Sequence, residues 1–373
     1  MNDKLFCHIA SKPTYTVCIY RATFSKLLLS EYKQLLKYLA TFFIIALLVI
    51  SCRKDSKKDK QIEPSNCLET TIIETNISEL FLSVYFLNAR DGFITGSHGG
   101  IYKTTDSAKT WIRLNSTISL PIRDIVFLDS SRGFAVGGED TCSGTGCVGA
   151  GGFILETLNG GQTWAKIFTP SNKIEIASIY FVDGATGFCA GDNVIFKTIN
   201  SGQTWSEYKI NNSGKMVQIS FADRQNGYAL DLFGKIIRTK NGGLTWEITS
   251  SGSNIGYYSL SVAGGSIYVA GQTKIIKSVN GGSSWSQLVN SPIDIFATHF
   301  INENDGFAFG RGNWSGGDFG HSYGSIFCTN DGGNTWEGNG DIKVLGLILS
   351  VSFPSNNTGY AISGNQIIRL DMK

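Results

Sequence analysis

Short apolar segments alternate with polar turns from about residue 67 to the end of the chain. Apolar segments such as 125–127 and 179–181 are each followed by a turn and then by a Gly-aromatic segment such as 133–137. Further short apolar segments follow, for example 195–197 and 236–238. Runs this short, bounded by turn-forming residues, predict β-strands joined by tight turns.

A second pattern follows the third predicted strand six times, in the form Thr-x-Asp/Asn-x-Gly-x-Thr-Trp with a few substitutions. The acidic or amide residue and the tryptophan of the six copies are Asp106 and Trp111, Asn159 and Trp164, Asn200 and Trp205, Asn241 and Trp246, Asn280 and Trp285, and Asp331 and Trp336. The spacing indicates one structural unit of about 40 residues, with two units enlarged by insertions.

The residue types of this motif predict a structural hairpin turn. Asp or Asn can bond the backbone nearby, glycine supplies positive φ, and tryptophan buries its ring at the edge of the core. Four of the six copies carry Asn, whose amide cannot perform the proton chemistry of a carboxylate. The motif is therefore interpreted as part of the scaffold.

A Gly-aromatic motif occurs seven times, from 92–96 to 359–364, with Ile267 in place of the first glycine in the fifth copy, so the chain holds seven units. Four short strands per unit predict an all-β fold, a seven-bladed β-propeller. The seventh unit stops after its third strand, 366–370, whereas residues 68–75 form an extra strand before the first unit. We expect this N-terminal strand to complete the last blade and so to remove two exposed edges.

The N-terminal region differs, because all 44 glycines of the chain lie at or after Gly92. Residues 38–50 are a continuous apolar run preceded by Lys33 and Lys37, too short to span a bilayer comfortably but typical of a signal peptide. The run ends at 49–52, Val-Ile-Ser-Cys, which resembles the lipobox of bacterial lipoproteins. That resemblance implies that Cys52 is lipidated and anchors the protein in the bacterial cell envelope.

Three regions follow from these features: a signal region (1–51), the lipidated Cys52 with a charged tether (52–66), and the propeller (67–373). A short membrane anchor or a buried helix is the alternative interpretation of the apolar run. About 37 residues precede the run, which is long for a signal peptide, so the true start of translation stays open.

The formal charge of +2 is not evenly distributed. Residues 1–52 hold six Lys or Arg and two Asp or Glu, so the rest carries 26 basic and 28 acidic residues, a net charge of −2. The mature chain therefore lacks the basic field that nucleic-acid binding requires. No phosphate-binding loop or other cofactor motif occurs, so we expect no cofactor.

The Thr-x-Asp/Asn-x-Gly-x-Thr-Trp motif resembles the Asp-box, or BNR repeat, of sialidases, sortilin-type receptors and some xyloglucanases. Together with the Gly-Phe-Ala-Val-Gly segment at 133–137, it more closely resembles the seven-bladed photosystem II assembly and stability factor family. That resemblance covers nearly all of residues 67–373. It implies a non-enzymatic role in the assembly or stability of a membrane protein complex.

A carbohydrate-active glycoside hydrolase of the Asp-box type is the alternative function. Such an enzyme needs a pair of carboxylates roughly 5–10 Å apart. Glu139, Asp140, Asp192, Asp231 and Asp318 are expected on the same face of the propeller as Arg311. Sialidase chemistry is disfavoured, because only Arg123 and Arg311 of the eight arginines after the tether are expected on that face.

A partner is expected to bind at the two glycine-rich insertions, 137–152 and 310–324, which join the second and third strands of their units. Loops on a rigid scaffold commonly carry binding functions. The candidate binding residues are Arg123, Glu139, Asp140, Arg311, Trp314, Asp318, Phe319, His321 and Tyr323. The expected partner is a protein or a glycan, and the alternative is that the loop aromatics only cover the backbone.

The cysteines suggest one disulfide. Cys142 and Cys147 lie in the first insertion and are candidates for a pair if the protein is exported. Cys67, Cys189 and Cys328 are expected to be buried thiols. His98, His299 and His321 do not have metal-ligand spacing, and no metal site is expected.

Overall fold

The computed structural model describes residues 67–139, 142–143, 146–147, 151–171, 174–251, 256–311, 322–344 and 346–373. Contacts divide the chain into two units, Met1–Glu63 and Pro64–Lys373, and the second unit holds the propeller. No segment in the described part of the chain forms a helix able to cross a membrane.

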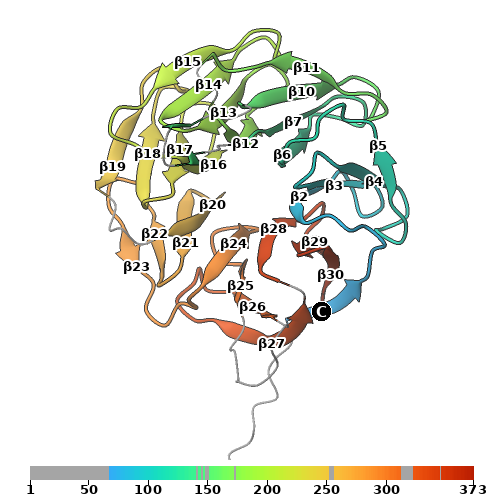
Figure 1. Ribbon diagram of the computed structural model, residues 1–373. Helices are drawn as coiled ribbons and strands as arrows, with labels where there is room; N and C mark the ends of the chain where they lie inside the picture. The colour runs from blue at the N-terminus through green and yellow to red at the C-terminus, as the bar shows by residue number, and fades with distance from the viewer. Residues whose placement is uncertain are drawn as a thin grey trace, which may run out of the picture. The chain divides into compact units, whose positions relative to one another are not determined.

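Seven four-stranded antiparallel sheets form a closed ring, as Figure 1 shows. The first three blades are β2 (Phe81–Phe86), β3 (Gly92–Gly96), β4 (Ile101–Thr104) and β5 (Ile112–Leu114); β6 (Ile122–Phe127), β7 (Gly133–Gly137), β10 (Phe153–Thr157) and β11 (Ala165–Phe168); and β12 (Ile176–Phe181), β13 (Gly187–Gly191), β14 (Val194–Thr198) and β15 (Ser206–Lys209).

The next three blades are β16 (Met216–Phe221), β17 (Gly227–Asp231), β18 (Lys235–Thr239) and β19 (Glu247–Ser251); β20 (Tyr257–Ala263), β21 (Ser266–Gly271), β22 (Ile275–Ser278) and β23 (Ser286–Gln287); and β24 (Ile295–Phe300), β25 (Gly306–Arg311), β26 (Ser322–Thr329) and β27 (Glu337–Val344). The last blade holds β28 (Ile348–Ser352), β29 (Thr358–Ser363), β30 (Gln366–Met372) and β1 (Leu68–Ile73). A small hairpin of β8 (Cys142–Ser143) and β9 (Gly146–Cys147) lies in the first insertion.

The predicted fold and the predicted closure are confirmed. β1 pairs antiparallel with β30, in a register that runs from Leu68 opposite Met372 to Ile73 opposite Ile367. The N-terminal strand is therefore the outer strand of blade seven, and the two ends of the propeller close the ring (Figure 1).

The hydrophobic core lies between neighbouring blades. The second strands of the blades are buried along their length, as in β7 and β13. One cluster joins Phe93 and Ile101 of blade one to Ile125, Ala135 and Leu155 of blade two. Burial of these apolar surfaces from water is the main force that holds the blades together.

The strand order gives the ring two distinct faces. Turns between the first and second strands and between the third and fourth strands lie on one face, which also carries the Trp motifs and is called the box face. Turns between the second and third strands, and the links between blades, lie on the opposite face. Both insertions leave from this second face, after β7 and β25, so it is called the insertion face.

Candidate functional site

The six Asp-box turns are held by internal hydrogen bonds. In blade one, the Asp106 carboxylate accepts from the backbone N–H of Thr110 at 2.9 Å and from the Thr110 hydroxyl at 2.6 Å. The hydroxyl of Thr104 donates to the same carboxylate at 2.8 Å. These bonds hold the pKa of Asp106 down, at about 2, chiefly through the Thr110 side chain.

The Asn copies reproduce this geometry with one bond reversed. Asn159 Oδ1 accepts from the backbone N–H of Thr163 at 2.9 Å, while its Nδ2 donates to the Thr163 hydroxyl at 2.9 Å. Thr163 can donate to a carboxylate or accept from an amide, so Asp and Asn serve equally well. Gly160 and Gly161 have φ of +66° and +86°, which explains the glycines at these positions. The motif acts as a scaffold.

A basic side chain links each of several blades to the Asp-box of the next blade. Lys103, Lys197 and Lys277 donate to the carbonyls of Gly160, Gly242 and Gly332, at 3.0, 2.7 and 3.2 Å. Arg238 donates to the carbonyl of Gly281 at 2.6 Å. All four basic residues directly precede the first residue of their own box. We call these contacts interblade clamps.

Blade six differs, because Cys328 occupies the clamp position before its box. Cys328 forms a disulfide with Cys67, the residue before β1. The expectation that both are buried thiols is therefore wrong. The contact joins residues 261 positions apart, which local sequence patterns do not show. Cys189 is a buried free thiol as expected, and burial raises its pKa well above the ordinary value.

A register shift recurs near the start of the innermost strand in every blade. The seven residues that the shift leaves without a partner are Leu82, Arg123, Ala177, Val217, Tyr258, Phe296 and Leu349. Each is at least partly exposed. Because these strands start at the insertion face and are innermost in the ring (Figure 1), the seven residues form a set that we call the inner ring. Bulges of this kind commonly re-aim side chains next to functional sites.

In blade two, the residue after the shift connects three neighbouring blades. The Asp124 carboxylate accepts from the hydroxyls of Ser83 and Ser178, at 3.2 and 3.1 Å, and from the backbone N–H of Ile179 at 3.0 Å. Burial raises the pKa of Asp124 despite these bonds. Blades one to three thus share one carboxylate, whose bonds connect their innermost strands.

Three charged side chains meet on the insertion face beside blade two. Glu175, in the link before β12, bonds to Arg123 through Nε and to Lys215 through Nζ. The Glu175 side chain is 2% exposed, whereas those of Arg123 and Lys215 are each 36% exposed. The buried carboxylate orients the two partly exposed cations, Arg123 and Lys215, and we call these three residues the cationic sector.

The opposite part of the inner ring is apolar. Tyr258 and Phe296 stack with ring centroids 4.9 Å apart and an angle of 13° between their planes. Leu349 is 43% exposed, and Leu80 and Ile293, just before β2 and β24, are 61% and 59% exposed. These five residues come from blades five, six, seven and one and form an apolar arc. Together with the cationic sector, they give the inner part of the insertion face an amphipathic character.

The residues predicted from the insertions are only partly described. Arg311 and Glu139 are exposed at the insertion-face ends of β25 and β7, and the Arg311 backbone N–H donates to the Asp294 carbonyl at 3.1 Å. Only the backbone of Tyr323 is described, in β26. Asp140, Trp314, Asp318, Phe319 and His321 lie outside the described residues, as does Cys52, and their roles stay predictions.

Cys142 and Cys147 are directly opposite each other in the β8–β9 hairpin. Their side chains are not among those described, so a disulfide there stays a prediction. The sequence analysis named Arg123 but not its contacts with Glu175 and Lys215, and it missed the apolar arc, because Glu175 and Ile293 lie in links that have no repeated pattern.

The carboxylates of the hydrolase alternative have different environments. Asp231 is fully buried and accepts from the backbone N–H groups of Gly214, Phe233 and Lys235, which makes it part of a turn. Asp192 accepts from the Asn193 amide at 2.7 Å. Within the described ranges, no three His, Cys, Asp or Glu side chains gather in a group that could hold a metal ion.

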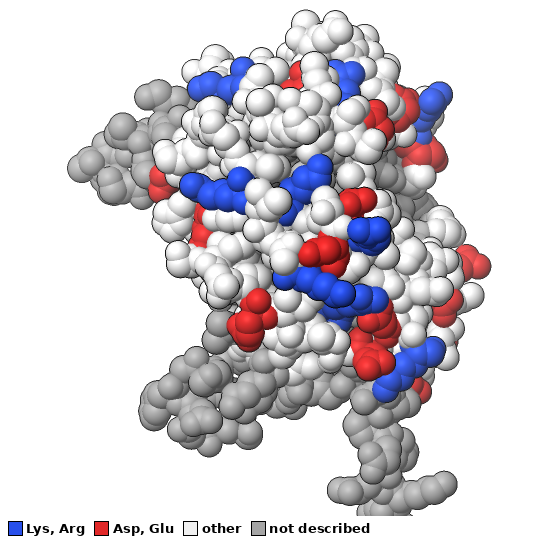
Figure 2. Space-filling model, turned by 90° about the vertical axis from the view of Figure 1, so that its right-hand side faces the viewer, with Lys and Arg blue, Asp and Glu red and all other residues white. Residues whose placement is uncertain are grey.

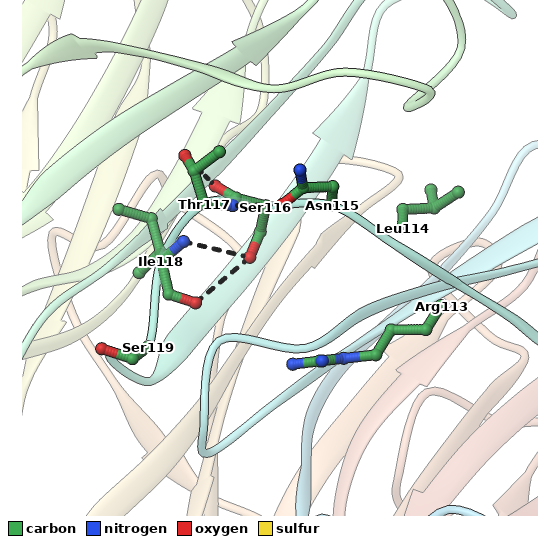
Figure 3. Close-up of a pocket in the computed structure, with 7 residues that line it drawn as sticks. All are labelled: Arg113, Leu114, Asn115, Ser116, Thr117, Ile118 and Ser119. Atoms are coloured by element: carbon green, nitrogen blue, oxygen red, sulfur yellow. Dashed lines mark hydrogen bonds between the residues drawn. The ribbon is translucent and has the colours of Figure 1, made fainter.

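A hollow of about 510 Å³ lies along the link between blades one and two (Figure 3). It is lined by the continuous segment from Arg113 to Ser119. The Ser116 hydroxyl donates to the carbonyl of Gly99 at 2.5 Å and also bonds with Ile118. The lining contains one charged residue, Arg113, so the hollow offers no acid–base pair.

Surface charges do not define a second site on the side shown in Figure 2. Lys and Arg lie among Asp and Glu there, and no field of one sign covers this side. This distribution agrees with the net charge of −2 after Cys52 and gives no support to nucleic-acid binding.

Comparison with known proteins shows which propellers the chain is similar to. Residues 205–293 match the family model described as photosynthesis system II assembly factor YCF48. The fold is similar to a solved structure of YCF48 bound to D1 peptide, with 18% identity, a TM-score of 0.62 and coverage of 83% of this chain and 98% of the other. YCF48 from Cyanidioschyzon merolae is similar at 14% identity and a TM-score of 0.64, over 81% of this chain and 98% of the other.

A GH74 xyloglucanase from Xanthomonas campestris has the same fold, at 11% identity and a TM-score of 0.58, over 80% of this chain. This chain spans only 52% of that enzyme. No curated protein matches the chain at a significant level. The recognition made from the repeats is confirmed: the chain is a seven-bladed BNR-type propeller that resembles the YCF48 photosystem II assembly factors in sequence over residues 205–293 and in fold over the whole ring.

Proposed function

We propose that this protein is a non-enzymatic, lipid-anchored propeller that binds a protein partner through its insertion face. In this proposal it acts as an assembly or stability factor for a complex of the cell envelope. The main support for this proposal is the inner part of the insertion face, which combines the cationic sector with the apolar arc. A similar propeller, YCF48, has been solved with a bound D1 peptide, which supports a polypeptide as the partner class.

The chemistry of the surface suggests what the partner segment contains. The apolar arc offers Leu80, Ile293 and Leu349, whose exposed area can be removed from water by apolar side chains. The cationic sector offers Arg123 and Lys215, oriented by a buried carboxylate. A segment with apolar residues and a carboxylate would satisfy both parts at once.

The tether is connected to the propeller on the face opposite the proposed binding surface. Leu68 pairs with Met372, at the end of β30 that lies on the box face, so the chain enters the propeller on that face. The tether between Cys52 and Cys67 has 14 residues, which can extend about 50 Å at most. An anchor at Cys52 would therefore be connected to the propeller through the box face and not through the insertion face.

The Cys67–Cys328 disulfide is a second argument for export. Disulfides form in oxidising compartments and are rare in reducing ones. A protein carried to the envelope by a signal peptide would acquire this bond there. Replacement Cys52→Ser should release the protein from the membrane fraction, and continued membrane association would contradict the lipid anchor.

The binding surface can be tested by comparing faces. The double variant Arg123→Gln/Lys215→Gln and the double variant Leu80→Ser/Ile293→Ser should each reduce partner capture from native membranes by at least about tenfold. Matched controls on the box face are Arg224→Gln, whose side chain is 75% exposed, and Ile199→Ser, 70% exposed. Equal capture by all four variants would refute this surface.

The same experiment separates the alternatives. Trp314→Ala/Tyr323→Ala tests whether the sixth-blade insertion contributes to binding. Binding to purified polysaccharides that depends on Tyr258 and Phe296 would indicate a glycan partner. Release of oligosaccharides from them would support the hydrolase alternative, for which the xyloglucanase likeness is the only specific observation.

A further inference from the structure

The strand that closes the ring is held by few side chains. β1 forms six register pairs with β30, but Leu68 is its only fully buried residue. The hydroxyl of Thr75 donates to the Asn365 carbonyl at 2.8 Å, just beyond the other end of the strand. Ile72 and Ile73 are partly buried against two hydrophobic clusters, and the fully buried Leu68 lies next to the disulfide.

The disulfide lies where other blades use a noncovalent clamp. At the clamp position, Lys103, Lys197 and Lys277 each reach the box of the next blade. Blade seven has no box, because its fourth strand comes from the N-terminus. Cys328 instead bonds Cys67, so the contact between blades six and seven on the box face is covalent.

A cavity gives access to this bond. It has a volume of about 300 Å³ and is lined by Cys67 and Cys328 together with residues that include Phe307, Asn330 and Met372. A volume of this size admits a small thiol reagent or the tip of a side chain. By contrast, Cys189 is fully buried within blade three, and no described cavity includes it.

We propose that the Cys67–Cys328 disulfide is a redox clasp that a dithiol reductant can open in the folded protein. A thiolate of the dithiol attacks one sulfur, the bond between Cys67 and Cys328 breaks, and the released cysteine takes up a proton. The second thiol of the reductant then displaces the other cysteine, so the reductant leaves as a disulfide. Two electrons pass to the protein, and both cysteines become thiols.

Opening the clasp removes the covalent link between blade six and the start of β1, which then stays in place through its pairing with β30 and the packing of Leu68 against Phe307 and Ile326. Because the covalent link at Cys67 no longer holds it, the Leu68 end of β1 then separates more often and exposes the backbone edge of β30. Such an edge can pair with another strand. The clasp thus couples the redox state of the surroundings to the completeness of blade seven.

The test uses the full chain in its native state, with Cys142→Ser/Cys147→Ser to remove the other candidate pair. After treatment with dithiothreitol and an alkylating reagent, peptide mapping should find Cys67 and Cys328 alkylated and Cys189 unmodified. Hydrogen exchange of residues 69–73 and 367–371 should accelerate at least about tenfold, while blades two to four stay unchanged.

Two results would overturn the proposal: a disulfide that resists dithiothreitol until the protein unfolds, or alkylation without faster exchange in β1. The variant Cys67→Ser/Cys328→Ser should show fast exchange without reductant and no further response to it. If that variant does not fold, alkylation and hydrogen exchange of the disulfide-bonded protein, with and without dithiothreitol, still test the proposal.

Discussion

The ring of Phe221 lies directly over the Cα atom of Gly227, its partner across the β16–β17 turn. A Cβ atom added to Gly227 would be 2.3 Å from the ring. The same Phe–Gly pair occurs in blades one, two, three, six and seven, at Phe86–Gly92, Phe127–Gly133, Phe181–Gly187, Phe300–Gly306 and Phe353–Gly359. Blade five has Val262 opposite Ile267 at this position, so the aromatic ring and the glycine are lost together.

Replacement Gly227→Ala should therefore destabilise the protein by about 1–3 kcal/mol, because the methyl group and the ring cannot share the space. Phe221→Val in the same chain should recover part of that loss, as the pair in blade five suggests. Denaturant unfolding of the two single variants and the double variant gives the coupling energy, expected to be at least about 0.5 kcal/mol. Additive effects would show that the pair is not sterically coupled.

Two turn glycines differ in whether an added methyl group would meet other atoms, so Gly→Ala at each position distinguishes the cost of backbone strain from the cost of a steric clash. Gly243 and Gly265 have φ of +77° and +83°, but an added Cβ would be 2.4 Å from the Phe188 ring at Gly243 and would touch nothing within 4 Å at Gly265. Gly265→Ala should cost about 1 kcal/mol, the price of a left-handed residue. Gly243→Ala should lower the free energy of unfolding by about 1–3 kcal/mol more than Gly265→Ala does. Denaturant unfolding of both variants measures this difference. Equal losses would contradict the packing of box glycines against the previous blade.

Acid should weaken the Asp boxes but not the Asn boxes. Hydrogen bonds from Thr110 and Thr335 lower the pKa of Asp106, to about 2, and that of Asp331. A lowered pKa stabilises the fold above the unfolded value near 3.8, and this contribution is lost as the pH falls toward 2. Asp106→Asn/Asp331→Asn should fold normally and lose less stability between pH 5 and pH 2.5 than the unmodified protein.

The lowered pKa values of Asp129, Asp183 and Asp223, in other turns of the box face, leave part of the acid sensitivity in that variant. The test therefore compares how steeply the free energy of unfolding falls with pH in the variant and in the unmodified protein, from denaturant midpoints measured at each pH. Identical slopes would show that the box carboxylates do not stabilise the fold.

The repeats allowed the ring to be predicted because each blade repeats its turn chemistry. Gly227 and Asn241 have the same local surroundings as their counterparts in other blades, so their roles can be inferred from sequence spacing. The closing strand could be predicted because blade seven lacks a fourth strand in sequence and β1 has no other blade to join.

Contacts between blades could not be predicted in this way. Cys328 precedes a box as Lys103 does, and that substitution was the one available signal for a special contact. Its partner, Cys67, lies outside the repeat. The bonds from Glu175 to Arg123 and Lys215 likewise join three blades through a link whose sequence does not recur.

His299 should make stability depend on pH near neutrality. It stacks on Phe353 with ring centroids 4.5 Å apart, and burial lowers its pKa to about 4. In the unfolded chain its pKa is near 6.5, so between these values the unfolded state binds a proton that the folded state does not. The free energy of unfolding should consequently fall as the pH is lowered from 6.5 to 4.

Two histidine variants test this pH dependence. His299→Phe keeps the stacking and should remove the contribution of His299, whereas His98→Gln, at an exposed position, should leave it unchanged. A resonance of His299 that titrates near pH 6.5 in the folded protein would contradict the argument.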